Sequence, residues 1–434
     1  MVTILFYMHA EPPAFYKFTK PVSSMSDSLI EPLSGGRGTK TDPFLEDLLG
    51  QYPQYFKEIL ANPASFKVQV IYTQIDRDSR NKPSFRDYFF HVNPDQYFYP
   101  ASTVKMPIAL LALQKLNELN LPGLDRNSSF LTDSAYNGQT PVYNDPTSPD
   151  GRPTIGQYIK KIFLVSDNDA FNRLYEFLGQ DYINRQLHKM GYQDVQIRRR
   201  LAVWLSLDEN RHTNPVSFYD SASGALLYHQ PMQVSDFSFP DRNDFVGKGY
   251  YTNTDNSLVN KPMDFSTNNR ISLEDQHHIL RSILFPEEVA SIQRFRIKPA
   301  DYPFVYQYMS QYPAETGYPP YDSATYRDAY CKFLYWGSEN GRLPKNIRIF
   351  NKVGDAYGFL TDIIYFTDQE NKIEFMLSAT IYCNSDGILN DDKYDYQTIG
   401  FPFMKNLGRV IYDYEKNRKR AFLPDLSRFK FDYR

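Results

Sequence analysis

The sequence predicts a mixed α/β protein of the α+β type, in which an antiparallel five-stranded sheet carries helices from both ends of the chain. Strand-like runs occur near both ends, at residues 66–92 and 348–383, and helical periodicity dominates the segment between them. Short connections between the runs favour antiparallel pairing. The chain has 434 residues, and single cores stop growing at roughly 250–300 residues, so we expect two lobes with a ligand-binding cleft between them.

The first 41 residues are expected to be a tail, signal or linker, because residues 17–41 are rich in Ser, Gly, Thr and Lys. The opening stretch MVTILFYMHAEPP places Ala10 before Glu11 after a short apolar run, as a secretory signal does, but it lacks a positive n-region. Three interpretations stay open: a true signal, a misplaced start codon, or an ordinary apolar N-terminus.

Folded structure is expected to begin at Asp42, a candidate N-cap followed by a proline at the first helical position. Apolar residues at helical spacing over residues 44–60 predict a helix with a bend at Pro53. Residues 66–72 and 84–92 then predict two strands. The short turn RDSRNKP between them predicts an antiparallel hairpin.

The middle of the chain is predicted to be mostly helical, with segments at residues 106–119, 154–165, 169–179 and 182–191. Glycines at 179 and 191 stand where helix C-caps belong. Residues 216–270 are rich in Asn, Asp, Ser, Tyr and Phe and are expected to be loops. A further helix is expected near residues 272–284.

The last part of the chain predicts three strands and a terminal helix, at residues 348–354, 359–368, 372–383 and 400–417. These strands and the N-terminal hairpin would share one antiparallel sheet. We therefore expect an α/β lobe of residues 42–101 and 340–434. The α-rich lobe would comprise residues 102–339, with an insertion around 216–330.

The charge balance argues against two classes of partner. The chain carries 48 basic and 51 acidic residues, a formal charge of −3, which gives no electrostatic reason to expect nucleic acid or an anionic membrane. It holds no run of 18 or more apolar residues, so no membrane span is expected. A small or neutral ligand fits better.

Cysteine and histidine usage gives no metal or cofactor site. Cys331 and Cys383 allow one bridge at most and no Cys-based zinc site. The adjacent pair His277 and His278 would point apart on a helix, so we interpret it as solvated surface rather than a metal site. We expect neither metal nor cofactor.

Ser102 and Lys105 stand one helical turn apart in the stretch YPASTVKMP, where a helical pattern begins. A helix start directs unsatisfied N–H groups and the positive end of the helix at Ser102, which favours an alkoxide or oxyanion there. Lys105 projects from the same face, within reach of the hydroxyl. It acts as a base only when partly neutral, which requires burial or a nearby positive charge. Ser-x-x-Lys alone recurs by chance in a chain of this length.

The tripeptide Ser166-Asp167-Asn168 lies between two predicted helices. A serine hydroxyl there can relay a proton, and an asparagine amide can bind both an amide-bearing substrate and the lysine. The alternative is a helix N-cap, since all three residue types cap well.

The third motif, Lys352-Val353-Gly354, lies on a predicted strand. The lysine supplies a cation near the cleft, and the glycine lets a substrate lie against the strand edge. Lys-x-Gly alone is common by chance.

The three motifs gain specificity from their order and setting: SxxK after a hairpin, SDN in the α-rich segment, and KxG on a late strand. In this arrangement the chain resembles the class A β-lactamases and the wider penicillin-recognising serine hydrolases, whose signature is SxxK, SDN and KTG. The resemblance covers roughly residues 42–215 and 345–418. It implies a serine hydrolase that forms an acyl-enzyme with an amide or β-lactam carbonyl.

The resemblance also implies roles for the acylating residues. Ser102 would be the acylated nucleophile, and Lys105 and Ser166 would take part in proton transfer. Asn168 would position the substrate amide.

On the substrate side, the resemblance implies that Lys352 and Gly354 hold the substrate. The backbone N–H groups of Ser102 and Asp355 would form the oxyanion hole. The resemblance also implies that the protein is located in the periplasm or outside the cell, as members of this family commonly are.

The loop after the SDN helices departs from the family pattern. Class A enzymes carry a glutamate there that activates the deacylating water, but this region reads IRRRLAVWLSLDENRHTNP, without Glu-Pro. The HTNP stretch is similar to the end of that loop, and counting back from it puts apolar residues where the acid belongs. Asp208 and Glu209 are the acids available, and we interpret them as loop or capping residues. Slow deacylation is therefore expected.

Two departures concern substrate choice. Val353 replaces the hydroxyl residue of KTG, and Thr361 falls where many class A enzymes keep an arginine. Both losses remove donors for a substrate carboxylate. Residues 216–340, including the Tyr- and Pro-rich stretch 302–323, supply surplus length. This surplus is either a lid or substrate wall, or decoration of the α-rich lobe.

The leading prediction is a β-lactamase-like serine hydrolase that acts on a small-molecule or peptide substrate. One alternative is a penicillin-binding protein, or a peptidase, amidase or esterase on a non-β-lactam substrate such as a cell-wall peptide. A second is a non-catalytic binding protein on the same fold. The sequence does not reveal the natural substrate or the oligomeric state.

Overall fold

The computed structural model describes residues 38–433, so the opening stretch and most of the predicted tail lie outside the described residues. Within the described part, Lys40 forms a bridge with Val92, and its backbone N–H donates to the Val92 carbonyl at 2.8 Å. The predicted start at Asp42 is therefore slightly late, since Lys40 already pairs with the strand segment at Val92. The predicted division into two lobes stays a prediction.

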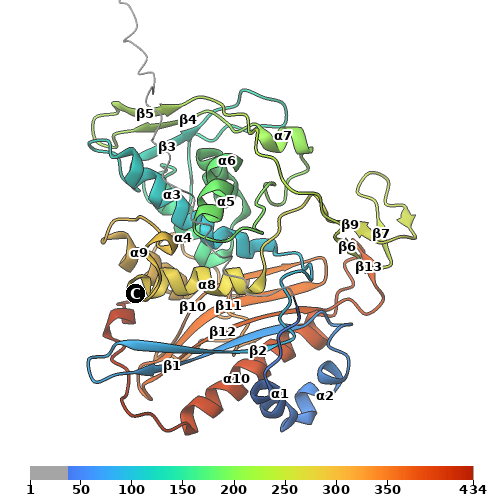
Figure 1. The fold of residues 1–434 in the computed structure, drawn as a ribbon. Coiled ribbons are helices and arrows are strands. Elements are labelled where there is room, and N and C mark those ends of the chain that lie inside the picture. Colours follow the sequence, from blue (N-terminus) through green and yellow to red (C-terminus); the bar gives the residue numbers. More distant parts are fainter. Residues whose placement is uncertain (1–37, 434) are drawn as a thin grey trace, which may run out of the picture. The chain divides into compact units, whose positions relative to one another are not determined.

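A five-stranded antiparallel sheet forms the centre of the fold, in the order β10-β11-β12-β1-β2 (Figure 1). Its strands come from both ends of the chain, as expected. Their bounds are β1 Gln69–Arg77, β2 Pro83–Phe90, β10 Ile347–Ala356, β11 Phe359–Asp368 and β12 Ile373–Tyr382. The predicted fold class is confirmed.

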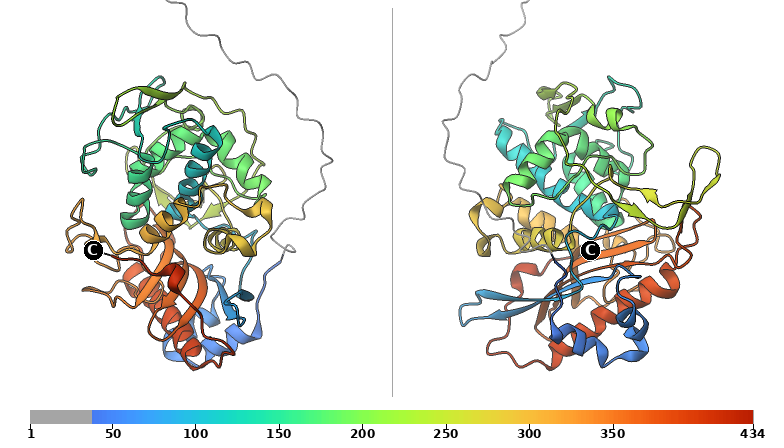
Figure 2. Two further views of the ribbon diagram at one scale, coloured as in Figure 1. Left: turned by 90° about the vertical axis from the view of Figure 1, so that its left-hand side faces the viewer. Right: turned by 45° about the vertical axis from the view of Figure 1, so that its right-hand side comes forward.

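One face of the sheet is covered by helices from the two ends of the chain, as both figures show (Figures 1 and 2). These are α1 (Pro43–Gly50), α2 (Pro53–Ala61) and the terminal helix α10 (Phe401–Asn417). The predicted bend at Pro53 is a full break, since a proline lacks the N–H that would continue the helix and fits the first turn of a new one. The Asp42 carboxylate does not cap α1; it accepts from the Phe89 N–H at 2.8 Å instead.

The opposite face is covered by the helices of the middle segment (Figure 1). α8 packs on β1, β11 and β12, and α9 packs on β10. Successive strand residues point to opposite faces, so Ile363 joins the core on this side and Ile364 joins the core under α10. The helices are α3 Lys105–Leu119, α4 Ile155–Val165, α5 Asn168–Leu178, α6 Gln180–Lys189, α7 Leu207–Arg211, α8 Leu273–Leu284 and α9 Asp301–Ser310.

The predicted helix ends are well defined. Gly179 ends α5 with φ +74°, and Gly191 follows α6 with φ +100°, both in the region that favours glycine. Short helical turns complete the described chain: η1 Ala101–Val104, η2 Pro286–Glu288, η3 Ser291–Gln293, η4 Pro313–Glu315, η5 Tyr396–Gly400 and η6 Ser427–Phe429.

Residues 216–270 are not simply loops, which corrects the sequence prediction. They contain short strands that pair with one another, β4 with β5, β6 with β9 and β7 with β8, and two of them also pair with distant strands, β4 with β3 and β7 with β13. Two- to five-residue strands give too short an alternation for a sequence pattern to reveal. Their bounds are β3 Ser129–Thr132, β4 Val216–Tyr219, β5 Leu226–Gln230, β6 Phe245–Val246, β7 Gly249–Tyr251, β8 Leu258–Val259, β9 Met263–Asp264 and β13 Ile388–Leu389.

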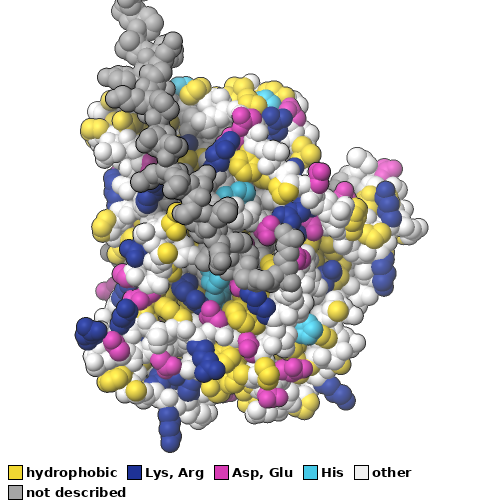
Figure 3. Space-filling view, viewed as in Figure 1, with side chains coloured by type: hydrophobic (Ala, Val, Ile, Leu, Met, Phe, Trp, Pro, Cys, Tyr) yellow, Lys and Arg dark blue, Asp and Glu magenta, His cyan; other side chains and the backbone are white. Residues whose placement is uncertain are grey.

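Charged side chains of both signs are interspersed on the described surface that Figure 3 shows. None of the described helices is long and apolar enough to cross a membrane. Cys331 and Cys383 are both free and buried.

The interpretation of His277 and His278 as solvated surface is wrong. The His277 ring is buried between α8 and the sheet, where its Nε2 lies 2.7 Å from Thr73 Oγ1 and its Nδ1 lies 2.7 Å from Ser378 Oγ. Burial is the main cause that lowers the pKa of His277 well below its usual value, and the nearby Arg281 guanidinium adds to it. Burial likewise lowers the pKa of His278 to about 4.

These shifts predict that His277 destabilises the fold in acid. The unfolded chain binds a proton near pH 6.5, whereas the folded chain binds it only at lower pH, so the free energy of unfolding falls as pH drops below 6.5. Between pH 6.5 and 4.5, the free energy of unfolding of the wild type should fall by up to about 1.4 kcal/mol per pH unit more than that of His277→Gln. Urea denaturation at several pH values measures this difference.

The comparison with a variant is needed because the buried Asp275, whose pKa burial raises to about 7, shifts stability in the opposite direction. Asp275 is present in both proteins, so its contribution to the pH dependence of stability cancels in the comparison. His229→Gln on β5, an exposed histidine, is the control and should track the wild type. Parallel pH curves for the wild type and His277→Gln would contradict the prediction.

Candidate active site

Ser102 lies in the turn η1, which runs directly into α3. The residue before it, Ala101, adopts φ +46°, an unfavourable conformation for a residue with a side chain. Ser102 lines a cavity of about 590 Å³. The predicted nucleophile thus stands at a helix start, on a strained turn, facing open space.

Strand β10 lies against this turn, and the close approach requires a glycine at position 354. A Cβ atom there would lie 2.6 Å from the Pro100 carbonyl oxygen and 3.0 Å from the Ser102 backbone nitrogen. The sequence analysis predicted that Gly354 lies beside the substrate. In the structure, the absence of a side chain at Gly354 lets β10 approach the turn that carries Ser102.

The SDN tripeptide combines the two interpretations that the sequence left open. Asp167 is a helix N-cap, since its carboxylate accepts from the Ala170 N–H at 2.7 Å and begins α5. Ser166 ends α4 in the left-handed conformation, with φ +55°, and Asn168 is the first residue of α5. Capping by Asp167 leaves the side chains of Ser166 and Asn168 to face the lysines.

Lys105 is fully buried and bound to this tripeptide. Its ammonium donates to the Ser166 carbonyl at 2.5 Å, to Ser166 Oγ at 3.3 Å and to Asn168 Oδ1 at 2.7 Å. No hydrogen bond joins it to Ser102 Oγ among the described residues.

Lys352 reaches the same serine from the sheet. Its ammonium donates to Ser166 Oγ at 2.9 Å and to the Val353 carbonyl at 2.9 Å. Ser166 Oγ therefore accepts from two lysines, one on α3 and one on β10. A hydroxyl between two amines is well placed to pass a proton.

Burial favours the neutral form of both lysines. It lowers the pKa of Lys105 well below its usual value, and the neighbouring Lys352 ammonium lowers it further. Burial also lowers the pKa of Lys352, while nearby Cys331 and Asp355 oppose that shift. The sequence analysis required burial or a nearby positive charge for a lysine base, and Lys105 has both.

Asp355 follows Gly354 on β10 and lines the cavity with its side chain exposed. Its backbone N–H belongs to the strand edge that approaches the Ser102 turn. Partial desolvation raises the pKa of its carboxyl, and the two lysines oppose this shift. Asp392 is the other acid among the described lining residues.

One wall of the cavity is the loop of residues 199–205, where the sequence lacks the expected glutamate. The loop is fixed to α5: Arg200 forms a buried ion pair with Glu176, and the Asn172 side chain exchanges hydrogen bonds with the Leu201 backbone at 2.9 and 3.0 Å. Trp204 is nevertheless 75% exposed and Val203 is 45% exposed. An anchored loop that exposes large apolar side chains to a cavity offers an apolar surface to a ligand.

Asp208 and Glu209 do not line the cavity, in agreement with their interpretation as loop and capping residues. Ser206 and Glu209 form a reciprocal capping box at the start of α7. The Asp208 carboxylate accepts from the Tyr136 hydroxyl at 2.6 Å.

The two positions that bear on carboxylate recognition also lie away from the cavity. Val353 packs in the core under the sheet. Thr361 is buried, and its hydroxyl lies 2.8 Å from that of Thr380. Neither residue offers a donor to a ligand in the cavity.

Several lining residues were missed by sequence reasoning. Three tyrosines and three asparagines contribute from separate loops, namely Tyr99, Tyr357, Tyr394, Asn253, Asn268 and Asn390. Asn253 and Asn268 belong to the insertion, which therefore forms part of the cavity wall, whereas no residue of 302–323 lines it. Within the described residues, His, Cys, Asp and Glu side chains form no group of three that would hold a metal ion.

A model of the beta-lactamase enzyme family matches residues 53–414, which is most of the chain. The chain belongs to this family. The match spans all three motifs and the helices and strands that carry them.

Solved structures of β-lactamases resemble this family member at low sequence identity. Those from Xanthomonas campestris and Streptomyces albus G are each 12% identical, match 85% of this chain and 98% and 99% of their own, and give TM-scores of 0.43 and 0.44. PBP-A, in an acyl-enzyme complex with penicillin G, is 16% identical, matches 85% of this chain and 96% of its own, and gives a TM-score of 0.46. A comparison with curated proteins found no match.

The contact at Gly354 gives a testable prediction. Gly354→Ala should push β10 away from the Ser102 turn and reduce labelling of Ser102 by a fluorophosphonate by about a hundredfold, because misplacement by about 1 Å has that cost. Gly50→Ala, at a site where a Cβ meets nothing within 4 Å, is the control. Circular dichroism should show that both variants fold. Undiminished labelling of Gly354→Ala would show that the close approach is not needed.

Proposed function

We propose that this beta-lactamase family member is a serine hydrolase of the class A type, which forms an acyl-enzyme at Ser102 with an amide or β-lactam carbonyl. One observation carries the proposal: Ser166 Oγ accepts from both Lys105 and Lys352 beside the cavity that Ser102 lines. A binding protein has no physical need for two buried lysines at one hydroxyl, since burying a cation is costly.

In the proposed acylation, neutral Lys105 takes the hydroxyl proton as Ser102 Oγ attacks the carbonyl carbon. The developing oxyanion accepts from the backbone N–H groups of Ser102 and Asp355. As the carbon–nitrogen bond breaks, Ser166 gives its proton to the leaving nitrogen, and the Lys105 ammonium restores the Ser166 proton. The proton of Ser102 thus ends on the amine, and both lysines return to their starting state.

Substrate placement falls to Asn168 and Lys352. Asn168 Oδ1 accepts from Lys105, which leaves its amide N–H groups for a substrate carbonyl in the cavity. Lys352 stands beside Ser166 as a cation for an anionic or carbonyl group.

Slow deacylation is part of the proposal. The loop of residues 199–205 supplies no carboxylate to the cavity, and Asp208 and Glu209 are engaged elsewhere. A water molecule that approaches the ester from this side meets apolar and cationic side chains rather than a base. We therefore expect a long-lived acyl-enzyme, as in a penicillin-binding protein.

The second candidate is a peptidase, amidase or esterase acting on a non-β-lactam substrate. It is supported by Asp355 and Asp392 in the cavity and by the positions of Val353 and Thr361, which offer no donor to a substrate carboxylate. The exposed Trp204 and Val203 favour an apolar acyl group in either case. By family habit, the proposed location is the periplasm or the cell exterior.

Intact-mass spectrometry with penicillin G and a chromogenic cephalosporin tests the proposal. The wild type should gain the mass of one acyl group, retained for minutes or longer, and Ser102→Ala should gain none. Lys105→Met should acylate at least about a hundredfold more slowly, since a general base contributes on the order of 10²–10⁴.

Each other outcome decides between candidates. A fleeting adduct with colour change would contradict slow deacylation and mean a true β-lactamase. No adduct from either β-lactam, together with Ser102-dependent labelling by a fluorophosphonate, would favour the peptidase, amidase or esterase. No labelling at all would leave a binding protein.

The apolar wall gives a separate prediction about substrate choice. Trp204→Ala should lower the second-order rate of acylation by penicillin G, which carries an aromatic acyl group, by about tenfold. The rate with 6-aminopenicillanic acid, which lacks that group, should stay nearly unchanged. Leu226→Ala, an exposed apolar residue that does not line the cavity, is the control. An equal loss with both substrates would show that Trp204 does not contact the acyl group.

A further inference from the structure

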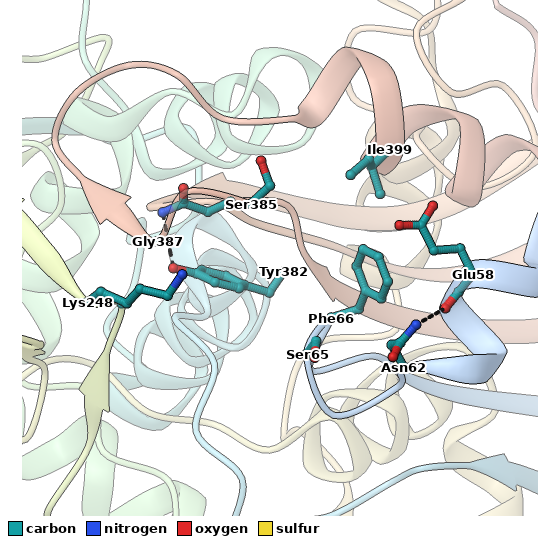
Figure 4. Close-up of a pocket in the computed structure, with 11 residues that line it drawn as sticks. Glu58, Asn62, Ser65, Phe66, Lys248, Tyr382, Ser385, Gly387 and Ile399 are labelled. Carbon is teal, nitrogen blue, oxygen red and sulfur yellow. Dashed lines mark hydrogen bonds between the residues drawn. The ribbon is translucent and has the colours of Figure 1, made fainter.

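A second cavity, of about 500 Å³, lies at the end of β12 and shares no lining residue with the cavity of Ser102 (Figure 4). Its walls come from the last turn of α2, the loop before β1, the turn between β6 and β7, and the segment after β12. Its volume lies in the range of small-ligand sites, about 300–1,000 Å³.

Opposite charges stand at the two sides of this cavity. Figure 4 shows Lys248 on one side and Glu58 on the other, with the rings of Tyr382 and Phe66 between them. Among the described residues, neither the Lys248 ammonium nor the Glu58 carboxylate has a hydrogen bond or an ion pair. Each charge is therefore free to meet a ligand of opposite charge.

The position of Lys248 is fixed by glycines. Its backbone N–H donates to the Gly387 carbonyl at 2.7 Å, and a Cβ on Gly387 would lie only 3.0 Å from Lys248 Cγ. Gly247 adopts φ +78°, and a Cβ there would lie 2.7 Å from the same Gly387 oxygen. The lysine stem thus lies against bare backbone at Gly387, which directs it along the edge of the cavity.

The interior of the cavity is largely apolar and has one wall held by a buried amide. Phe66, Tyr382 and Ile399 supply the apolar surface. Asn384 is only 7% exposed and donates through Nδ2 to the Tyr382 hydroxyl at 3.1 Å and the Ile388 carbonyl at 2.9 Å. These two bonds hold the Asn384 side chain in the cavity wall, and its Oδ1 is buried.

We propose that this cavity binds a short zwitterionic peptide with one apolar side chain. The ligand's carboxylate pairs with Lys248, its ammonium pairs with Glu58, and its side chain packs on Phe66, Tyr382 and Ile399. A purely anionic ligand would meet the Glu58 carboxylate, and a purely apolar one would leave both charges unused.

Isothermal titration calorimetry of the full chain carrying Ser102→Ala with glycyl-phenylalanine tests the site without turnover. We expect one-to-one binding with a dissociation constant on the order of 1 mM or tighter. The N-acetylated and the C-amidated forms of the same dipeptide each lose one charge. Each should bind about tenfold more weakly.

Added substitutions locate the site. Lys248→Met and Glu58→Gln should each weaken binding about tenfold, and each should remove the discrimination against the dipeptide blocked at its own end. Lys57→Met, an exposed lysine on the same helix as Glu58 that does not line the cavity, should bind as the parent does. Thermal melting checks that the variants fold.

Several results would overturn the site. These are no saturable heat at about 10 mM dipeptide, equal binding of the blocked forms, or binding that survives both substitutions. The outcome does not depend on acylation, because Ser102→Ala cannot form the adduct. Loss of the proposed hydrolase activity and loss of this site are therefore separate results.

Discussion

Two buried lysine side chains that share one serine hydroxyl set the constraint that the rest of the fold satisfies. A buried amine needs its hydrogen bonds satisfied, and two ammonium groups so close would repel, which favours the neutral form of Lys105. The structure satisfies them with the Ser166 carbonyl and hydroxyl, the Asn168 side chain and the Val353 carbonyl. Lys105 is held by a helix and Lys352 by the sheet, so these two elements must keep a fixed distance. The glycine at 354 makes that distance possible by removing a side chain from the contact.

Most of the fold and the centre of the site could be predicted from the sequence, because both leave strong local signals. The strands of the sheet read as β-rich runs bounded by turns, and each predicted strand was found within a few residues. Lys105, Ser166 and Lys352 meet because the order of elements brings three distant segments to one place, and Ser102 lies one turn before Lys105 on the cavity that Asn168 also lines. The cap formed by Asp167, the contact of Asn168 with Lys105 and the close approach at Gly354 needed the geometry, since any residue of the tripeptide Ser-Asp-Asn can cap a helix.

What the sequence missed depends on contacts between distant segments. His277 stands beside another polar residue on an amphipathic helix, so the local sequence does not indicate that it is buried. Its burial depends on contacts with Thr73 and Ser378, which lie on distant strands. The strands between residues 216 and 270 are only two to five residues long, and two of them also pair with strands far along the chain, as β7 does with β13. The exposure of Trp204 also depends on distant contacts. A large apolar residue is usually expected to be buried, but the contacts of Arg200 and Leu201 with α5 hold this loop in a position that leaves Trp204 exposed.

The segment from Asn384 to Tyr394 lines both cavities, with Asn384 and Gly387 in one and Asn390 and Tyr394 in the other. It is tied internally, since the Asn384 side chain donates to the Ile388 carbonyl and the Tyr394 hydroxyl accepts from the Asn390 N–H. An insertion or deletion here would reshape both cavities at once. During divergence, the specificity of one cavity cannot be tuned through this segment without altering the other, and the two will tend to change as a unit.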